Sequence, residues 1–348
     1  MKFHYPILLL FFVCESSSQN KIIVASGLDK SGRSNFPTEI IDLDDPLTEN
    51  QFLSAYPFAS HGASSILLND KLIICGGVGN HSNECYSLQN DEFTYEQNLA
   101  EPRIYSGNFE FEGLLISGGY PLGSTASKTL EHFGGILKNN LEIPQPTRAH
   151  CMAYGNNIEA HSIWIIGGHT GQSEEESYVT RQTYYYYVHD GQWYPGSNLN
   201  FAREFHACSS IHFGSQYGEA LIVVAGGRDE DGNALDTVEF LREDDGSWLH
   251  GPKLPKPLFG HSMITLADNR VIVNGGQDGK EASKDIFELV CDFSTFGLDC
   301  EWTVLEQKLT YPRFGMTVVK HFETKITHSP PTKTATGLSQ VKSSTSFP

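Results

Sequence analysis

Four arginines recur at corresponding places along an acidic chain of 348 residues. They are Arg103, Arg148, Arg203 and Arg313, and the other two positions of the same column hold Phe58 and Leu258. The guanidinium group is a planar charged fork that matches carboxylate and phosphate groups. Because the formal net charge of the chain is −18, this column predicts a cationic site for an acidic ligand. The structural alternative is that each arginine binds loop carbonyls or an acidic side chain of a neighbouring unit.

Three histidines fall in a second column, three residues after the arginine column. This column consists of His61, Ser106, Cys151, His206, His261 and Met316, at spacings of 45, 45, 55, 55 and 55 residues. Histidine is a zinc ligand, but zinc needs its ligands within about 2.1 Å of one centre. Repeats place equivalent residues around a ring, so we predict no metal site and no other cofactor. The sequence contains no P-loop, GxSxG, HExxH or CxxC motif, which leaves it without a recognisable catalytic set.

The strands that position these arginines and histidines are written as apolar runs that end in a pair of glycines. The pairs begin at residues 76, 118, 167, 226 and 275, and IIVASG at 22–27 is a weaker copy. Aliphatic residues precede each pair and a second strand follows it, without helical periodicity. Glycine is needed where φ is positive or where another backbone comes too close for a Cβ. Repeats of about 50 residues in a strand-rich chain are typical of a β-propeller.

The order of these features resembles the kelch motif across roughly residues 20–322. A strand, Gly-Gly, an aromatic-bearing strand, a tryptophan (Trp193, Trp248 or Trp302) and Arg-x-x-His follow one another. The resemblance implies an all-β, six-bladed kelch-type β-propeller with four strands in each blade. The first unit lacks an innermost strand, whereas RFGMTVVKHF at 313–322 has no glycine pair after it. We therefore expect the C-terminal strand to enter the first blade and close the ring, which removes unpaired sheet edges.

The resemblance also suggests a function. Kelch adaptors of ubiquitin ligases bind acidic peptides through arginines of comparable placement, although arginine recurs there even where no ligand is known. We expect a non-catalytic protein-interaction module that binds a protein or acidic ligand at one face. The alternative is a sugar-binding protein or a sialic-acid-type mutarotase or epimerase, which needs a carboxylate facing the arginines; Glu101 and Glu204 are candidates. The acidic chain argues against nucleic acid as a partner.

The two ends of the chain differ in composition from the repeats. Residues 1–18 have a lysine, an apolar run and small residues before a cleavage point, which predicts a signal peptide and secretion. Residues 19–322 form the expected propeller, and the Ser/Thr/Pro-rich tail at 323–348 is expected to be disordered. Neither end has an apolar segment long enough to span a membrane. Asn80 begins an Asn-His-Ser sequon, a candidate glycosylation site in an exported chain.

Six cysteines remain after the predicted leader, which permits three disulfides in an exported protein. Cys291 and Cys300 bracket one loop and are the best candidate pair. Cys75 and Cys85 lie on strands that the repeat makes neighbours, and they are the second candidate pair. The two remaining cysteines, at 151 and 208, form either a bridge or two free thiols.

Overall fold

A computed structural model describes residues 20–58, 60–120, 125–134, 141–156, 161–171, 173, 175–212, 220–242, 246–292 and 299–321. Every regular element in these ranges is a β-strand. None of the described segments is a helix that could cross a membrane. The predicted leader at 1–18 and tail at 323–348 lie outside the described residues, so both remain predictions.

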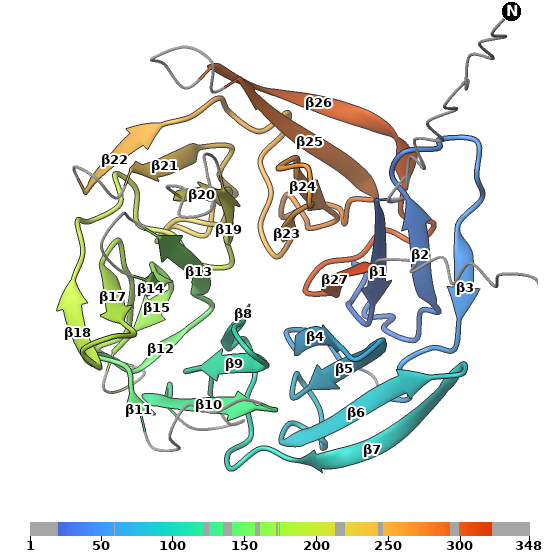
Figure 1. Ribbon diagram of the computed structural model, residues 1–348, viewed down its shortest axis with the longest axis horizontal. Helices are drawn as coiled ribbons and strands as arrows, with labels where there is room; N and C mark the ends of the chain where they lie inside the picture. The colour runs from blue at the N-terminus through green and yellow to red at the C-terminus, as the bar shows by residue number, and fades with distance from the viewer. Residues whose placement is uncertain are drawn as a thin grey trace, which may run out of the picture.

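Six antiparallel sheets have four strands each, and a seventh has three (Figure 1). The first consists of β27 (Thr317–His321), β1 (Lys21–Ala25), β2 (Thr38–Asp42) and β3 (Gln51–Leu53). The second consists of β4 (Ser64–Leu68), β5 (Lys71–Cys75), β6 (Glu84–Gln89) and β7 (Glu92–Asn98). The third consists of β8 (Gly107–Glu110), β9 (Leu114–Ser117), β10 (Thr129–Phe133) and β11 (Leu141–Glu142).

The remaining sheets continue in chain order. The fourth consists of β13 (Cys151–Asn156), β14 (His161–Ile166), β17 (Thr183–Tyr187) and β18 (Gln192–Pro195). The fifth consists of β19 (Ala207–His212), β20 (Ala220–Ala225), β21 (Val238–Arg242) and β22 (Ser247–His250). The sixth consists of β23 (Ser262–Thr265), β24 (Val271–Asn274), β25 (Asp285–Asp292) and β26 (Asp299–Lys308). The small sheet consists of β12 (Thr147–Arg148), β15 (His169–Thr170) and β16 (Tyr178–Val179).

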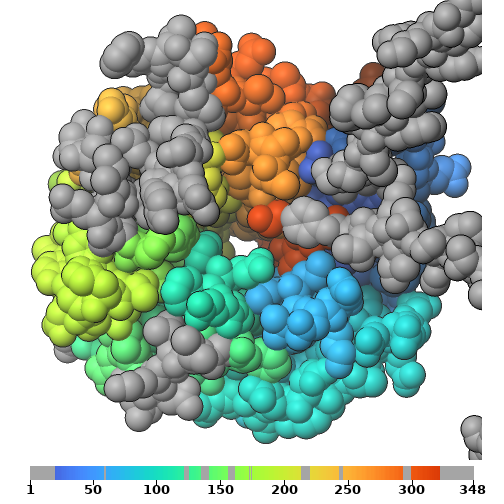
Figure 2. All heavy atoms as spheres, viewed as in Figure 1, coloured from blue at the N-terminus to red at the C-terminus, as the bar shows by residue number. Residues whose placement is uncertain are grey.

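The four-stranded sheets follow one another around a centre, with strands β4, β8, β13, β19, β23 and β27 innermost (Figure 1). Side chains leave a narrow opening at this centre (Figure 2). The described residues are therefore all-β in an arrangement consistent with a β-propeller.

The C-terminal strand pairs with the N-terminal one. Strand β27 is antiparallel to β1, with Ile23 opposite Val319 and Val24 opposite Val318. A further bridge joins Leu28 to Phe314. The last described strand thus occupies the place beside β1 that the sequence left without an innermost strand.

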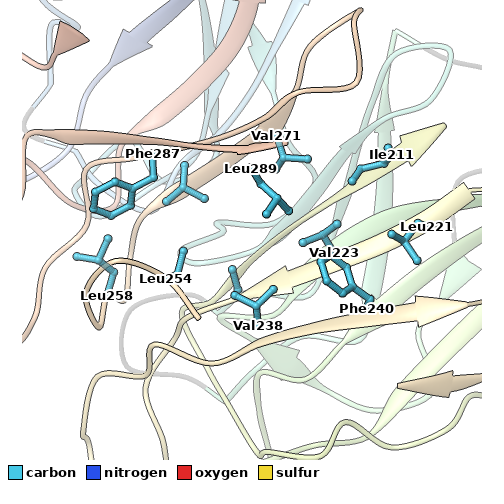
Figure 3. Close-up of a cluster of buried hydrophobic side chains, with 12 residues drawn as sticks. Ile211, Leu221, Val223, Val238, Phe240, Leu254, Leu258, Val271, Phe287 and Leu289 are labelled. Atoms are coloured by element: carbon cyan, nitrogen blue, oxygen red, sulfur yellow. The ribbon is translucent and has the colours of Figure 1, made fainter. Parts of the chain in front are cut away.

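The core lies between neighbouring sheets, and strand β20 shows why its sequence is apolar throughout. All six of its side chains are buried. Side chains alternate across a strand, so Val223 lies in the cluster shared with the sixth sheet, to which Phe287 and Leu289 also belong (Figure 3). Its neighbour Val224 packs in the cluster shared with the fourth sheet, beside Trp164. Full burial of each such side chain stabilises the fold by about 1.5–3 kcal/mol.

The glycine pairs end these buried strands where one sheet meets the next. Gly226 has φ +61°, and a Cβ added there would lie 2.5 Å from the carbonyl oxygen of Leu258. Gly227 has φ +97°, and its amide donates to that same carbonyl at 2.8 Å. Both glycines are needed, because the left-handed conformation and the close backbone contact exclude a side chain.

The hydrogen bond from the second glycine recurs in every unit and fixes which residues are equivalent. Its acceptors are the carbonyls of Ser60, Arg103, Thr147, Arg203, Leu258 and Arg313. Three residues further on stand Ala63, Ser106, His150, His206, His261 and Met316.

The alignment of the two columns therefore needs correction in two units. Arg148 and Cys151 are each one residue beyond the equivalent positions, which are Thr147 and His150. Phe58 and His61 are each two residues before the equivalent positions, which are Ser60 and Ala63. The sequence alignment matched arginine with arginine, whereas the backbone hydrogen bond from the glycine pair sets the true register.

Three disulfides are present. Cys75–Cys85 joins β5 to β6, and Cys291–Cys300 joins β25 to β26. Both predicted pairs are thus confirmed. Cys151–Cys208, left open by the sequence, is also a bridge, and it links the innermost strands of two adjacent sheets with a Cα–Cα distance of 5.9 Å.

Candidate functional site

Three of the four predicted arginines are inside the protein. The exposed fractions of Arg103, Arg203 and Arg313 are 1%, 0% and 0%. The Arg203 guanidinium donates to the carbonyl of Gly226 at 2.7 Å and to the carboxylate of Glu239 at 2.7 Å. Its charge is therefore balanced within the fold.

The same arrangement occurs around the other two buried arginines. Arg103 donates to Glu131 and to the Gly118 carbonyl, and Arg313 donates to Glu39 and to the Ser26 carbonyl. The second carboxylate oxygen of each glutamate accepts from the backbone amide three residues before its arginine. These amides belong to Ala100, Asn200 and Thr310.

The expected position of these three arginines at an open channel mouth is therefore corrected. Arg103, Arg203 and Arg313 fix the segment before each innermost strand to the next strands of the same sheet. All three guanidinium groups are buried and ion-paired with a glutamate, so a ligand in solution cannot reach them.

Arg148 differs because it is one residue out of register. It lies on β12, opposite His169 of β15, and its guanidinium lies 4.8 Å from the centre of the Tyr120 ring. Arg148 is the one member of the predicted set that lines a cavity, and its role in ligand binding stays a prediction.

The cavity that Arg148 lines has a volume of about 370 Å³, and we call it the mouth cavity. Its side chains come from Tyr105, Tyr120, Arg148, His169, Glu204, Phe205, Arg228, Phe259, Gln277 and Phe314. Gly260 and Gly315 complete the wall. Each side chain stands either directly after a glycine pair or directly before an innermost strand, so five units contribute to one cavity.

Two aromatic residues of the mouth cavity adopt an unusual backbone conformation. Tyr105 and Phe205 both have φ +53°, whereas the equivalent positions in three other units are glycines. A bulky residue with positive φ is disfavoured, and such residues are concentrated at functional sites. Their rings lie edge to face, with centroids 4.8 Å apart. This conformation makes the mouth cavity a candidate site independently of its charges.

Glu204 is the buried acid of the mouth cavity, with a side chain 6% exposed. Its carboxylate accepts from Arg228 Nε at 2.7 Å and from His169 Nδ1 at 3.0 Å. Burial alone raises the pKa of the Glu204 carboxyl, but the His169 hydrogen bond and the Arg228 charge together hold that pKa below its ordinary value. Glu204 therefore stays ionised at neutral pH.

Arg228 presents a cation between two aromatic rings. The guanidinium carbon lies 4.8 Å from the centre of the Phe205 ring and 5.6 Å from that of Phe259. Only the Nε edge is used by Glu204. Among the described residues, the terminal nitrogens of Arg228 have no hydrogen-bond partner.

Curated proteins show similarity to part of the chain. No protein-family model matches it. Kelch-like protein 36 of Bos taurus is 30% identical over 139 residues, that of Mus musculus 28% over 136, and that of Rattus norvegicus 27% over 136. The matched part is 39% of this chain and 20% of each relative. The similarity supports a kelch-repeat protein. The chain aligns with about a fifth of the length of these relatives.

The other predicted residues lie away from the mouth cavity or have other roles. Glu101 accepts hydrogen bonds from Ser127 and Thr129 and is not part of the cavity wall. His206 and His261 are buried in separate units. No group of three or more metal-ligating side chains occurs within the described ranges. Asn80 is exposed, and its glycosylation stays a prediction.

Arg228 and His169 were missed by the sequence reasoning. Both stand directly after a kelch glycine pair, a column made up of Leu28, Val78, Tyr120, His169, Arg228 and Gln277. The column varies in residue type, so it carries no repeated signal. The signal that could have identified these two residues is the variation in residue type at this one position of an otherwise regular repeat.

Proposed function

We propose that the protein is a secreted kelch-type propeller of six blades, closed by β27, that acts as a non-catalytic protein-interaction module. The six four-stranded sheets and the pairing of β27 with β1 support closure. The predicted leader and the three disulfides support export, because disulfides persist in oxidising compartments. A closed ring presents its loops on two rigid faces, which suits binding.

The proposed site is the mouth cavity, and its partner is an acidic segment of another protein. The observation that carries this proposal is the pair of arginines, Arg148 and Arg228, among aromatic walls. Among the described residues that line the cavity, Glu204 is the only acid beside these two arginines, on a chain of net charge −18. Aromatic and arginine side chains are the residue types that dominate binding energy at protein interfaces.

Selection of displayed peptides by the immobilised full-length protein tests this proposal. We expect enrichment of acidic sequences by the natural protein and loss of that enrichment in Arg148→Gln/Arg228→Gln. Arg33→Gln is the matched control, because Arg33 also lies over two rings, those of Phe36 and Tyr311, but outside the mouth cavity. Equal enrichment by the double variant and the control would place binding elsewhere.

The alternative is an acidic-sugar-binding protein or a mutarotase-type enzyme. It is favoured by one observation, the contact of Glu204 with both Arg228 and His169, since proton transfer needs a carboxylate near the cations that hold an acidic sugar. Exchange between the anomers of sialic acid, followed by NMR, separates the two proposals. If the protein accelerates anomer exchange and Glu204→Gln abolishes the acceleration, the enzyme is established. If the exchange rate is the same with and without the protein, a non-catalytic role is supported.

A further inference from the structure

We propose that the mouth cavity recognises an anion joined to a flat apolar ring, and that Arg228 is the residue that anchors the anion. This inference rests on the proposed function, because it names the ligand chemistry of the same cavity. It follows from the way in which Arg228 is held.

Arg228 is fixed in one orientation by three neighbours. Phe205 and Phe259 cover the guanidinium at 4.8 and 5.6 Å, and Glu204 accepts from its Nε at 2.7 Å. Glu204 is itself held by His169, at 3.0 Å. A guanidinium held in this way loses little conformational freedom on binding, which favours a ligand that uses its remaining edge.

The remaining edge of Arg228 consists of its two terminal nitrogens, which have no protein partner among the described residues. The Arg228 side chain is 36% exposed, so a ligand can reach it from solvent. Two parallel N–H groups match the two oxygens of a carboxylate or a sulfate. Both anions share this chemistry, and the experiment separates them.

A second part of the ligand must contact the aromatic side chains. Tyr105 makes edge contacts with Phe205 at 4.8 Å and with His61 at 5.6 Å, and His61 contacts Phe314 at 6.3 Å. Burial raises the pKa of Tyr105 to about 12, so its hydroxyl stays neutral at physiological pH. Of these rings, those of Tyr105, Phe205 and Phe314 line the mouth cavity and form a largely apolar wall beside the charged one.

Because the cavity has a charged wall and an apolar wall, we expect that neither the anion nor the ring alone binds tightly. An ion pair that is partly open to water contributes little to affinity by itself. An aromatic contact adds to affinity beyond the apolar area that it buries. The cavity volume of about 370 Å³ accommodates both parts of one small group.

Calorimetric titration of the full-length protein with small probes tests the inference. The ring-bearing anions are phenyl sulfate and phenylacetate, the ringless anions are sulfate and acetate, and benzyl alcohol is the neutral ring. We expect either ring-bearing anion to bind about tenfold more tightly than the ringless and neutral probes. A preference for sulfate or for carboxylate then identifies the source of the anion, and either preference supports the inference.

Variants assign the effect to residues. Arg228→Gln should weaken binding of the ring-bearing anions about tenfold and leave benzyl alcohol unaffected, whereas Phe314→Leu, in the apolar wall, should weaken binding of all ring-bearing probes. Arg33→Gln should bind as the natural protein does. If Arg228→Gln folds but binds the aryl anions equally well, or if ringless anions bind as tightly, the inference is wrong.

The probe titration and the peptide selection can fail independently of each other. Acidic peptides bound through Arg148 and Arg228 without any preference for aryl anions would leave the proposed function intact and overturn this inference. Aryl anions bound through Arg228, with no acidic peptide selected, would support the inference and contradict the protein-interaction role.

Discussion

At the scale of single residues, burial separates five arginines of this chain into two groups. Arg103, Arg203 and Arg313 are buried and paired with glutamates, whereas Arg148 and Arg228 line the mouth cavity. The first group stabilises the fold, and the second lies in the cavity that we propose as the binding site. Substitutions in the two groups should therefore change different measurements.

The buried pair of Arg203 and Glu239 gives the first prediction. Glu239→Gln leaves the Arg203 charge without a counter-charge inside the protein, so we expect a loss of about 3–5 kcal/mol in the free energy of unfolding. Denaturant titration measures it. The exposed Arg33→Gln should change stability by less than about 0.5 kcal/mol. A loss equally small in Glu239→Gln would show that the pair is not important for stability.

The buried histidines give a prediction about pH. Burial lowers the pKa of His150 to about 3 and of His261 to about 4, and it lowers that of His206 in the same direction. The unfolded chain has an ordinary histidine pKa of about 6.5. Protons therefore bind the unfolded state first, and stability present above pH 6.5 is lost as the pH falls toward 4.

His261→Met tests this directly, because Met316 occupies the equivalent position of the last unit. One such histidine should lower the free energy of unfolding by about 2 kcal/mol between pH 6.5 and pH 5. Denaturant titrations at both pH values should show that the variant loses about 2 kcal/mol less than the natural protein. Parallel pH dependences would contradict the assignment of a neutral, buried His261.

At the scale of elements, the sequence predicted the strands and disulfides well and the residues of the mouth cavity poorly. The Gly226–Gly227 pair is recognisable because both positions exclude a Cβ, and this requirement recurs in each unit. Arg148 was misplaced because one arginine resembles another in sequence, while a backbone hydrogen bond decides the register. Arg228 was missed because the position after the glycine pair holds a different residue type in each unit.

The disulfide between β13 and β19 gives a prediction at this scale. Cys151–Cys208 closes a sequence separation of 57 residues between adjacent sheets, while Cys291–Cys300 closes only 9 within one hairpin. Chain entropy gives about 4 kcal/mol for the long loop and about 3 kcal/mol for the short one. Thermal unfolding should show a larger loss for Cys151→Ser/Cys208→Ser than for Cys291→Ser/Cys300→Ser. The reverse order would mean that the ring does not depend on this link.

At the scale of the whole molecule, the contacts of the C-terminal segment decide whether the fold is one cooperative unit. Arg313 pairs with Glu39, and Met316 and Val319 pack into clusters on opposite faces of the first sheet. Deletion of residues 313–322 should therefore destabilise every sheet. Hydrogen exchange should show lost protection even in β13 and β19, far from β27. Loss confined to β1 and β2 would contradict closure, and truncation after residue 322 is the matched control.

The central claim is that this molecule binds an acidic partner through the mouth cavity. Its most direct test is the calorimetric affinity of one selected acidic peptide for the full-length protein and for Arg148→Gln/Arg228→Gln. Affinity should fall by about tenfold or more while the double variant still folds, because neither arginine belongs to the fully buried set of Arg103, Arg203 and Arg313. Equal affinities for the two proteins would contradict it.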